Sequence, residues 1–176
     1  EAHHKKPISE LKGNEILAKL LQGKNVALTS DSGTPGISDP GYHLVNLAIS
    51  QGIEVVPIPG PTAAIAALCV SGLPTDRFIF EGFLPAKGAK REKVLLKYEK
   101  EESTAIFYES PYRLMRFLED VLRLLGNRKM VVAREMTKMY EEIIRGKAEE
   151  IVKYYQDRKI RGEITILLGG FEKERA

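Results

Sequence analysis

A run of small and polar residues at positions 30–41 is the part of this sequence best suited to hold a ligand. It reads S-D-S-G-T-P-G-I-S-D-P-G and follows a short apolar run, residues 25–28, that predicts a buried strand. Open α/β sheets bind ligands at the carboxyl ends of their strands. The run matches neither the dinucleotide fingerprint nor the Walker loop. An ordinary loop is the alternative, because Gly, Pro, Ser and Asp are common in turns.

A second loop of the same kind covers residues 58–64 and reads I-P-G-P-T-A-A. It follows another apolar run, residues 54–58, that also predicts a strand. The small residues that follow the loop allow close approach of backbone to backbone. Together the two loops are expected to line one edge of a sheet. A helix packed tightly through its alanines is the alternative.

The elements that would position these loops follow from the apolar periodicity. In the first half, helices are expected from Asn14 to Gly23, around residues 44–49 and at 62–71, alternating with the two strands; this order is typical of a parallel sheet. Gly72 and Pro74 interrupt the pattern, so we expect a partial N-terminal α/β domain at 1–74 and a C-terminal α+β domain at 75–176.

The second domain is predicted to hold a mixed sheet. Its expected strands are residues 77–83, 104–108, 129–134, 141–145 and 163–168. Its expected helices are one opened by Ser110 and ended by Gly126, and one at 147–156.

Composition narrows the class of protein. A chain of 176 residues that is 43% hydrophobic can bury a real core, and no apolar run reaches the roughly 18 residues of a membrane span. We therefore expect a cytoplasmic protein without a membrane partner. Cys69 is the only cysteine and is expected in the core, and the adjacent His3 and His4 indicate a solvated terminus, so no metal site is expected.

Charge is unevenly distributed along the chain. Residues 1–74 carry five lysines and six acidic residues, net −1, whereas residues 75–176 carry twenty-two basic and eighteen acidic residues, net +4. If a polyanion binds, the second half should contact it.

Seven ordered motifs carry a family resemblance. They are S-D-S-G-T-P-G-I-S-D-P-G-Y, P-I-P-G-P-T-A-A-I-A-A-L, S-G-L-P-T-D-R-F, F-E-G-F-L-P, F-Y-E-S-P-Y-R-L, A-R-E-M-T-K-M-Y-E-E and R-G-E-I-T-I-L-L. The sequence resembles the RsmI-type ribosomal RNA methyltransferases of the tetrapyrrole-methylase superfamily. The resemblance implies two α/β domains, a homodimer, S-adenosylmethionine as cofactor, and 2'-O-methylation of a cytidine in small-subunit ribosomal RNA.

The resemblance also implies roles for particular residues. The cofactor would bind Asp31, Ser32, Gly33, Thr34, Pro35 and Gly36 of the first loop and Pro61, Thr62 and Ala63 of the second. A ribose hydroxyl is a weak nucleophile, so a base or a cation near it would help. The catalytic candidates are Glu109, Arg134, Glu135 and Lys138, which follow predicted strands. The alternative is that the last three form an ion-pair network with Glu141 and Glu142.

RNA phosphates would contact a basic cluster formed by Lys87, Lys90, Arg91 and Lys93. A solvated helix start is the alternative for this cluster.

One departure from the family pattern stands out: its opening strand and G-T-P-I-G-N-L loop do not occur here. We therefore expect this chain alone to be inactive. Two other functions stay open, methylation of a small tetrapyrrole-like acceptor and a non-catalytic RNA-binding module, because one fold supports many activities.

Overall fold

The structure is a computed structural model that describes residues 10–172. The chain forms two compact units, Glu1–Thr62 and Ala63–Ala176, which are described separately. His3 and His4 lie outside the described residues.

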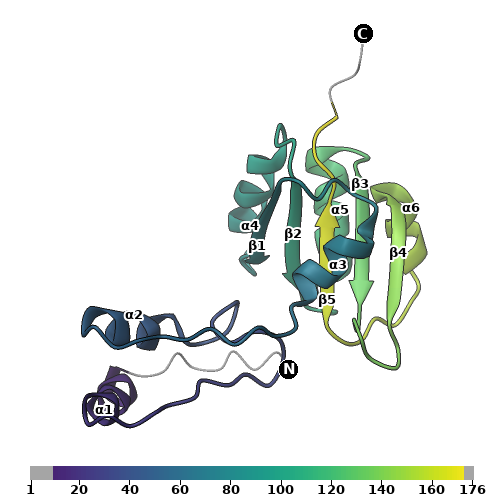
Figure 1. Cartoon of the computed structure of the whole chain (residues 1–176). Helices are drawn as coiled ribbons and strands as arrows, with labels where there is room; N and C mark the ends of the chain where they lie inside the picture. The colour runs from purple at the N-terminus through teal and green to yellow at the C-terminus, as the bar shows by residue number, and fades with distance from the viewer. Residues whose placement is uncertain (1–9, 173–176) are drawn as a thin grey trace. The chain divides into compact units, whose positions relative to one another are not determined.

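A five-stranded mixed sheet forms the centre of the second unit (Figure 1). In sheet order its strands are β1 (Phe78–Phe83), β2 (Thr104–Glu109), β5 (Ile164–Leu168), β3 (Lys129–Arg134) and β4 (Glu142–Lys147). The β1–β2 pair is parallel and the other pairs are antiparallel. This confirms the mixed sheet expected of the second half.

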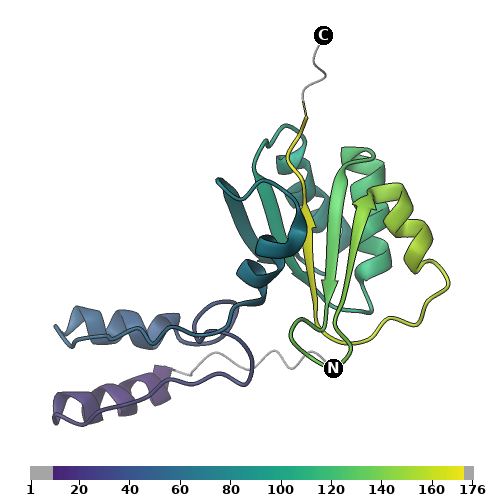
Figure 2. The ribbon, with the colours of Figure 1, turned by 45° about the vertical axis from the view of Figure 1, so that its right-hand side comes forward.

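Helices cover both faces of this sheet (Figures 1 and 2). One face carries α4 (Gly88–Leu95), followed by the short η1 (Leu96–Tyr98), α5 (Leu114–Leu125) and α6 (Ala148–Tyr155), and the other carries α3 (Ala63–Ser71). Successive side chains of a strand point to opposite faces, so a strand buried on both faces is apolar throughout.

Strand β2 illustrates this two-sided burial. Its Phe107 is fully buried in the larger core cluster together with Phe117 of α5 and Ile151 of α6. Its Ile106, one residue away, is fully buried on the α3 side. Removing one of these aromatic side chains should cost about 3–5 kcal/mol of stability.

Helix α5 begins later than expected. Residues 110–113 form a turn closed by the Arg113 amide bonding the Ser110 carbonyl (2.9 Å), and the helix itself starts at Leu114. The helix ends before Gly126, as expected. Gly126 has a φ of 78°, a conformation that would be strained for a residue with a side chain.

Helix α3 packs through Ala64, Ala67 and Leu68, which are buried against the sheet. Cys69 points away from that contact and is exposed, so its expected core position was wrong. Because α3 packs on this sheet, it belongs to the second compact unit. The boundary between the two units therefore lies between Thr62 and Ala63. The domain boundary expected at residue 74 stays a prediction.

The first unit contains α1 (Glu10–Leu21) and α2 (Tyr42–Ser50). Gly13 of α1 permits a close approach, because a Cβ there would lie 3.3 Å from the Cδ1 of Leu47 in α2. Asn14 lies inside α1 rather than capping its start.

The strands expected at residues 25–28 and 54–58 are not formed. A strand is defined by hydrogen bonds to a neighbour, and within residues 10–172 none is paired with these two segments. Their apolar side chains consequently face solvent, with Val56 64% and Ile58 80% exposed. The α/β class is confirmed, whereas residues 10–74 of the described chain form no parallel sheet.

Candidate functional site

Charged residues gather at one end of the sheet in the second unit. Glu109 ends β2 and Arg134 ends β3, and both pair in register with Ile164 at the start of β5. Arg134 also pairs with Glu142 at the start of β4. Residues directly opposite one another share a face, and Ile164 belongs to the core under α5 and α6. Glu109 and Arg134 therefore lie on this face, with backbones about 10 Å apart across two strand spacings.

Glu109 is buried, with only 3% of its surface exposed. Its Oε1 accepts hydrogen bonds from the Ser110 amide (2.7 Å) and from the Arg113 Nε (2.7 Å). A buried carboxylate needs such partners to stay charged. The carboxylate of Glu109 therefore holds the turn at residues 110–113 in place.

Arg134 belongs to a network centred on Glu142. The Arg134 Nε donates to Glu142 Oε2 (3.2 Å), and the hydroxyls of Tyr154 and Tyr155 donate to the same carboxylate (3.0 and 3.1 Å). Burial alone would raise the pKa of Glu142, but hydrogen bonds from Tyr154, Arg134 and Tyr155 outweigh it and hold the pKa below its ordinary value. Burial raises the pKa of Tyr155, so this tyrosine remains a donor.

Glu135 and Lys138 form a second network with Glu163. The Glu135 Oε1 accepts from the Glu163 amide (2.8 Å) and from the Lys138 Nζ (3.1 Å), and Lys138 also reaches Glu163 Oε2 (3.0 Å). The hydrogen bond from the Glu163 amide is the main cause that lowers the pKa of Glu135. Burial opposes the charge on Lys138, but its bonds to the two carboxylates raise its pKa overall.

The loop that holds this second network is tightly constrained. Glu135 and Thr137 have positive φ of 52° and 64°, which few residues other than glycine adopt. Gly162 has a φ of 90°, which favours glycine, and an added Cβ would overlap the Glu135 side chain. Ion pairs therefore join Arg134 to Glu142 and Lys138 to Glu135 and Glu163. The catalytic role of Arg134, Glu135 and Lys138 stays a prediction.

An open hollow of about 560 Å³ lies beside these networks. Its lining includes Arg134, Tyr140, Glu142, Arg158, Lys159 and Arg161. Sequence reasoning missed Tyr140 and the last three of these residues. The available signal was the basic run R-K-I-R at 158–161, placed directly before a glycine and a strand.

The two loops expected to bind cofactor meet in the first unit. The Thr34 hydroxyl donates to the Pro61 carbonyl (2.9 Å), although the two residues are 27 positions apart. The Ser30 hydroxyl donates a hydrogen bond to the Ser32 carbonyl (2.8 Å), which closes a local turn. The two loops therefore lie close together, as expected, although the strands expected before them are not formed.

Glycines leave room along the first loop. Gly33 and Gly36 have φ of 72° and 82°, and a Cβ at Gly36 would meet nothing within 4 Å. Asp31 is exposed and Pro35 half-buried in the same loop. Thr62 ends the first unit, and Ala63 begins α3 in the second. A loop with open glycine backbone and polar neighbours fits a ligand held mainly by backbone groups.

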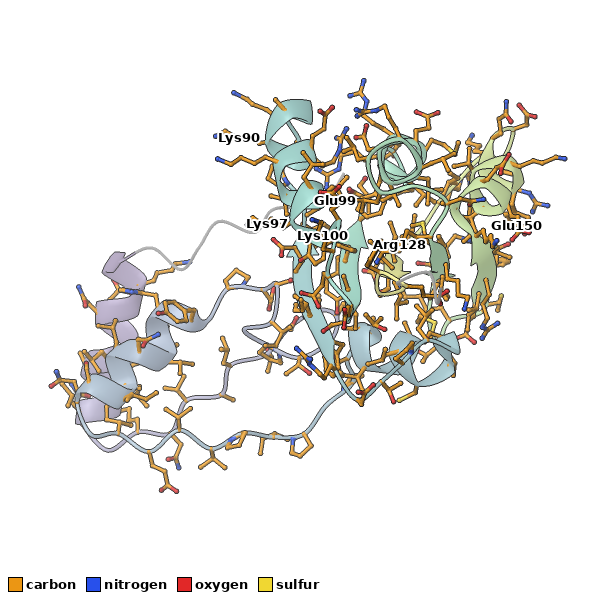
Figure 3. All side chains as sticks on the ribbon, turned by 90° about the horizontal axis from the view of Figure 1, so that it is seen from above. Lys90, Lys97, Glu99, Lys100, Arg128 and Glu150 are labelled. Atoms are coloured by element: carbon orange, nitrogen blue, oxygen red, sulfur yellow. The ribbon has the colours of Figure 1, made fainter. Side chains whose placement is uncertain are left out.

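The basic cluster of α4 divides into two kinds of residue. Lys87 precedes the helix, and Lys90 and Lys93 are exposed on it; Figure 3 shows Lys90 pointing outward. Arg91 is instead 3% exposed and bonded to Asp120, with its Nε 2.8 Å from Oδ2. Arg91 cannot reach an RNA phosphate while it compensates this buried carboxylate, so we withdraw it from the RNA candidates.

Residues 10–172 contain neither a metal-binding cluster nor a membrane-spanning helix. Within them, no three histidine, cysteine, aspartate or glutamate side chains are placed to hold a metal ion. No helix in the described part of the chain is long and apolar enough to cross a membrane.

Comparisons with known proteins identify the family of this chain. Residues 3–152 match the family model of the tetrapyrrole (corrin/porphyrin) methylases. The ribosomal RNA small subunit methyltransferase I of Thermotoga maritima is 48% identical over 158 residues, covering 90% of this chain and 71% of that protein. The protein of the same name from Halalkalibacterium halodurans is 47% identical over 161 residues, covering 92% of this chain and 56% of its own length.

A solved structure shares the fold at low sequence identity. It is the uroporphyrin-III C-methyl transferase of Thermus thermophilus in complex with S-adenyl homocysteine, with a TM-score of 0.60 and 19% identity, covering 92% of this chain and 73% of that one. The chain spans little more than half the length of most of the curated relatives it matches. Since the family model covers most of the chain, and close relatives share nearly half of its residues, the chain belongs to the tetrapyrrole (corrin/porphyrin) methylase family.

Proposed function

We propose that the full-length protein transfers a methyl group from S-adenosylmethionine to the ribose 2'-hydroxyl of a cytidine in small-subunit ribosomal RNA. The observation that carries the proposal is the 48% identity, across 158 residues, to a protein named as a ribosomal RNA small subunit methyltransferase. Fold alone would leave the acceptor open, since a uroporphyrin methyltransferase has the same architecture at 19% identity. The sequence identity favours RNA over a tetrapyrrole.

The first unit would hold the cofactor. Its joined loops, residues 31–36 and 61–62, offer open glycine backbone at Gly36 and a fixed contact between Thr34 and Pro61. We include Ala63, which begins α3, on the matched motif. S-adenosylmethionine supplies the electrophilic methyl carbon when bound. A fold neighbour bound to S-adenyl homocysteine supports this choice of cofactor.

The charged residues at the end of the sheet would position the reacting groups and supply positive charge. They are Glu109, Arg134, Glu135 and Lys138. In-line methyl transfer depends chiefly on alignment and exclusion of water. Glu109 is buried and already accepts hydrogen bonds from Arg113 and the Ser110 amide. The lowered pKa of Glu135 makes this carboxylate a weak general base near neutral pH. We assign positioning roles to the two carboxylates: Glu109 positions Arg113, and Glu135 positions Lys138. The hydroxyl proton would pass to solvent as the oxygen bonds the methyl carbon and the carbon–sulfur bond breaks. Arg134 and Lys138 would stabilise the developing negative charge on that oxygen.

We also propose that the protein works in the cytoplasm as a homodimer. Ribosomal RNA is the partner inferred from the named relatives. Size-exclusion chromatography with light scattering of the full-length protein would give a dimer mass, and a monomer mass would contradict the dimer.

The test of the acceptor uses the full-length protein with S-adenosylmethionine labelled in its methyl group. We expect label in small-subunit ribosomal RNA and none in uroporphyrin III offered under the same conditions. Label in the tetrapyrrole but not in the RNA would overturn the proposal. Cofactor and RNA binding without transfer to either acceptor would favour a non-catalytic RNA-binding module.

A further inference from the structure

The hollow at the sheet end carries an uncompensated positive charge. Four of its lining residues are cations, Arg134, Arg158, Lys159 and Arg161, against the two carboxylates of Glu135 and Glu142. Those carboxylates are already paired, Glu142 with Arg134 and Glu135 with Lys138. Within residues 10–172, the side chains of Lys159 and Arg161 are exposed and have no acidic partner.

The loop carrying these cations is held in one conformation by contacts on both sides. Arg158 lies over the ring of Tyr154, 3.7 Å from its centroid, and donates to its hydroxyl (2.8 Å). The Arg161 carbonyl accepts a hydrogen bond from Arg134 Nη1 (3.4 Å). Gly162 follows with positive φ, close against Glu135. A loop fixed in this way presents its cations without a large ordering cost on binding.

An exposed aromatic side chain completes the hollow. Tyr140 lines it and is 69% exposed, on the segment between β3 and β4. An apolar ring left in solvent beside free cations is typical of single-stranded nucleic-acid sites, where bases stack on aromatic rings and phosphates meet lysine or arginine. An anionic small molecule would use the cations but would leave the ring without a partner.

We propose that this hollow is an RNA-binding subsite in which Lys159 and Arg161 contact backbone phosphates and Tyr140 stacks on a base. The subsite is distinct from the lysines of α4. It rests on the proposed function, because it requires RNA as the partner, and it extends that function to Tyr140 and to two residues of the loop at 156–162.

The test measures RNA affinity of the full-length protein across a salt series, using a transcript of small-subunit ribosomal RNA. The variant is Lys159→Ala with Arg161→Ala. Its matched control is Arg116→Ala with Lys153→Ala, which removes the same two charge types from exposed positions on α5 and α6. Each lost phosphate contact should flatten the plot of log affinity against log salt by about 0.7–0.9. We expect a decrease of about 1.4–1.8 in slope for the variant and none for the control.

Tyr140 gives an independent readout. Tyr140→Ala should weaken RNA binding about tenfold without changing the salt slope, because stacking involves no counterion, and Tyr140→Phe should retain the affinity. Affinity for S-adenosylmethionine should stay unchanged in all four variants.

The outcomes separate the two proposals. If the unmodified protein binds and methylates the RNA but the Lys159/Arg161 variant gives a salt plot parallel to that of the control, the subsite is refuted and the function stands. If that variant loses cofactor affinity instead, the hollow is a cofactor site and the inference is wrong. If the unmodified protein neither binds nor methylates the RNA, the proposed function fails first.

Discussion

Replacing Arg91 by alanine tests whether this residue serves the fold rather than the RNA. The side chains of Arg91 and Asp120 are 4% and 10% exposed, so the change leaves a buried carboxylate without one of its two arginine partners. Removing one member of a buried pair typically costs 3–5 kcal/mol. Arg123 still donates to Asp120 Oδ1 (2.7 Å), which places the expected loss near the lower end, about 3 kcal/mol.

Urea unfolding of the full-length protein at neutral pH would measure this loss. Lys90→Ala is the matched control, because Lys90 is exposed on the same helix and its removal should change stability by less than about 0.5 kcal/mol. The double variant Arg91→Ala with Asp120→Ala should lose less stability than the sum of the losses in the two single variants, since the two side chains interact directly. Equal stabilities of Arg91→Ala and Lys90→Ala would refute this reasoning.

The same pair predicts a dependence on pH. Burial would raise the pKa of Asp120, but hydrogen bonds from Arg123 and Arg91 lower it below its ordinary value of 3.8. A carboxylate with a lowered folded-state pKa contributes stability above its unfolded pKa and loses that contribution as the pH falls through the folded value. The stability difference between the unmodified protein and Asp120→Asn should therefore be constant at neutral pH and shrink below about pH 4. A difference that grows on acidification would contradict the assignment.

Three other predictions concern the binding surfaces. Gly36→Val should reduce affinity for S-adenosylmethionine at least tenfold by calorimetry, whereas Gly52→Val, which also has a positive φ and open surroundings, should not; equal losses would indicate backbone strain rather than a blocked site. Lys90→Ala with Lys93→Ala should lower the salt slope of RNA binding by about 1.4–1.8, and an unchanged slope would return α4 to the class of solvated helices. Residues 1–176 alone should bind S-adenosylmethionine more weakly than the full-length protein; equal affinity would show that the family's opening segment does not contribute to the site.

Local patterns predicted the second unit well. Strand β3 occupies the expected residues 129–134, and the apolar face of α5, including Phe117 and Val121, is buried as its spacing indicates. These elements depend on periodicity and on neighbours within the same unit. The strands expected at 25–28 and 54–58 failed, because a strand also requires a partner, and sequence periodicity does not reveal whether one is present.

The candidate site was predicted in part for similar reasons. The sequence indicated charged residues directly after strands, and the strand register places Glu109 and Arg134 at the same end of the sheet. The burial of Arg91 was not predictable, since Asp120 lies 29 positions away and belongs to another helix. The hollow was missed because Tyr140 and the cations at 158–161 come from different segments, which only the fold brings together.

Mapping the methylated nucleotide tests the central claim most directly. Small-subunit ribosomal RNA labelled by the full-length protein and methyl-labelled S-adenosylmethionine would be digested to nucleosides and separated by chromatography with mass spectrometry. The proposed function predicts that the label elutes as 2'-O-methylcytidine, with the added mass on the ribose fragment. Label on a base, or on the ribose of another nucleoside, would contradict it.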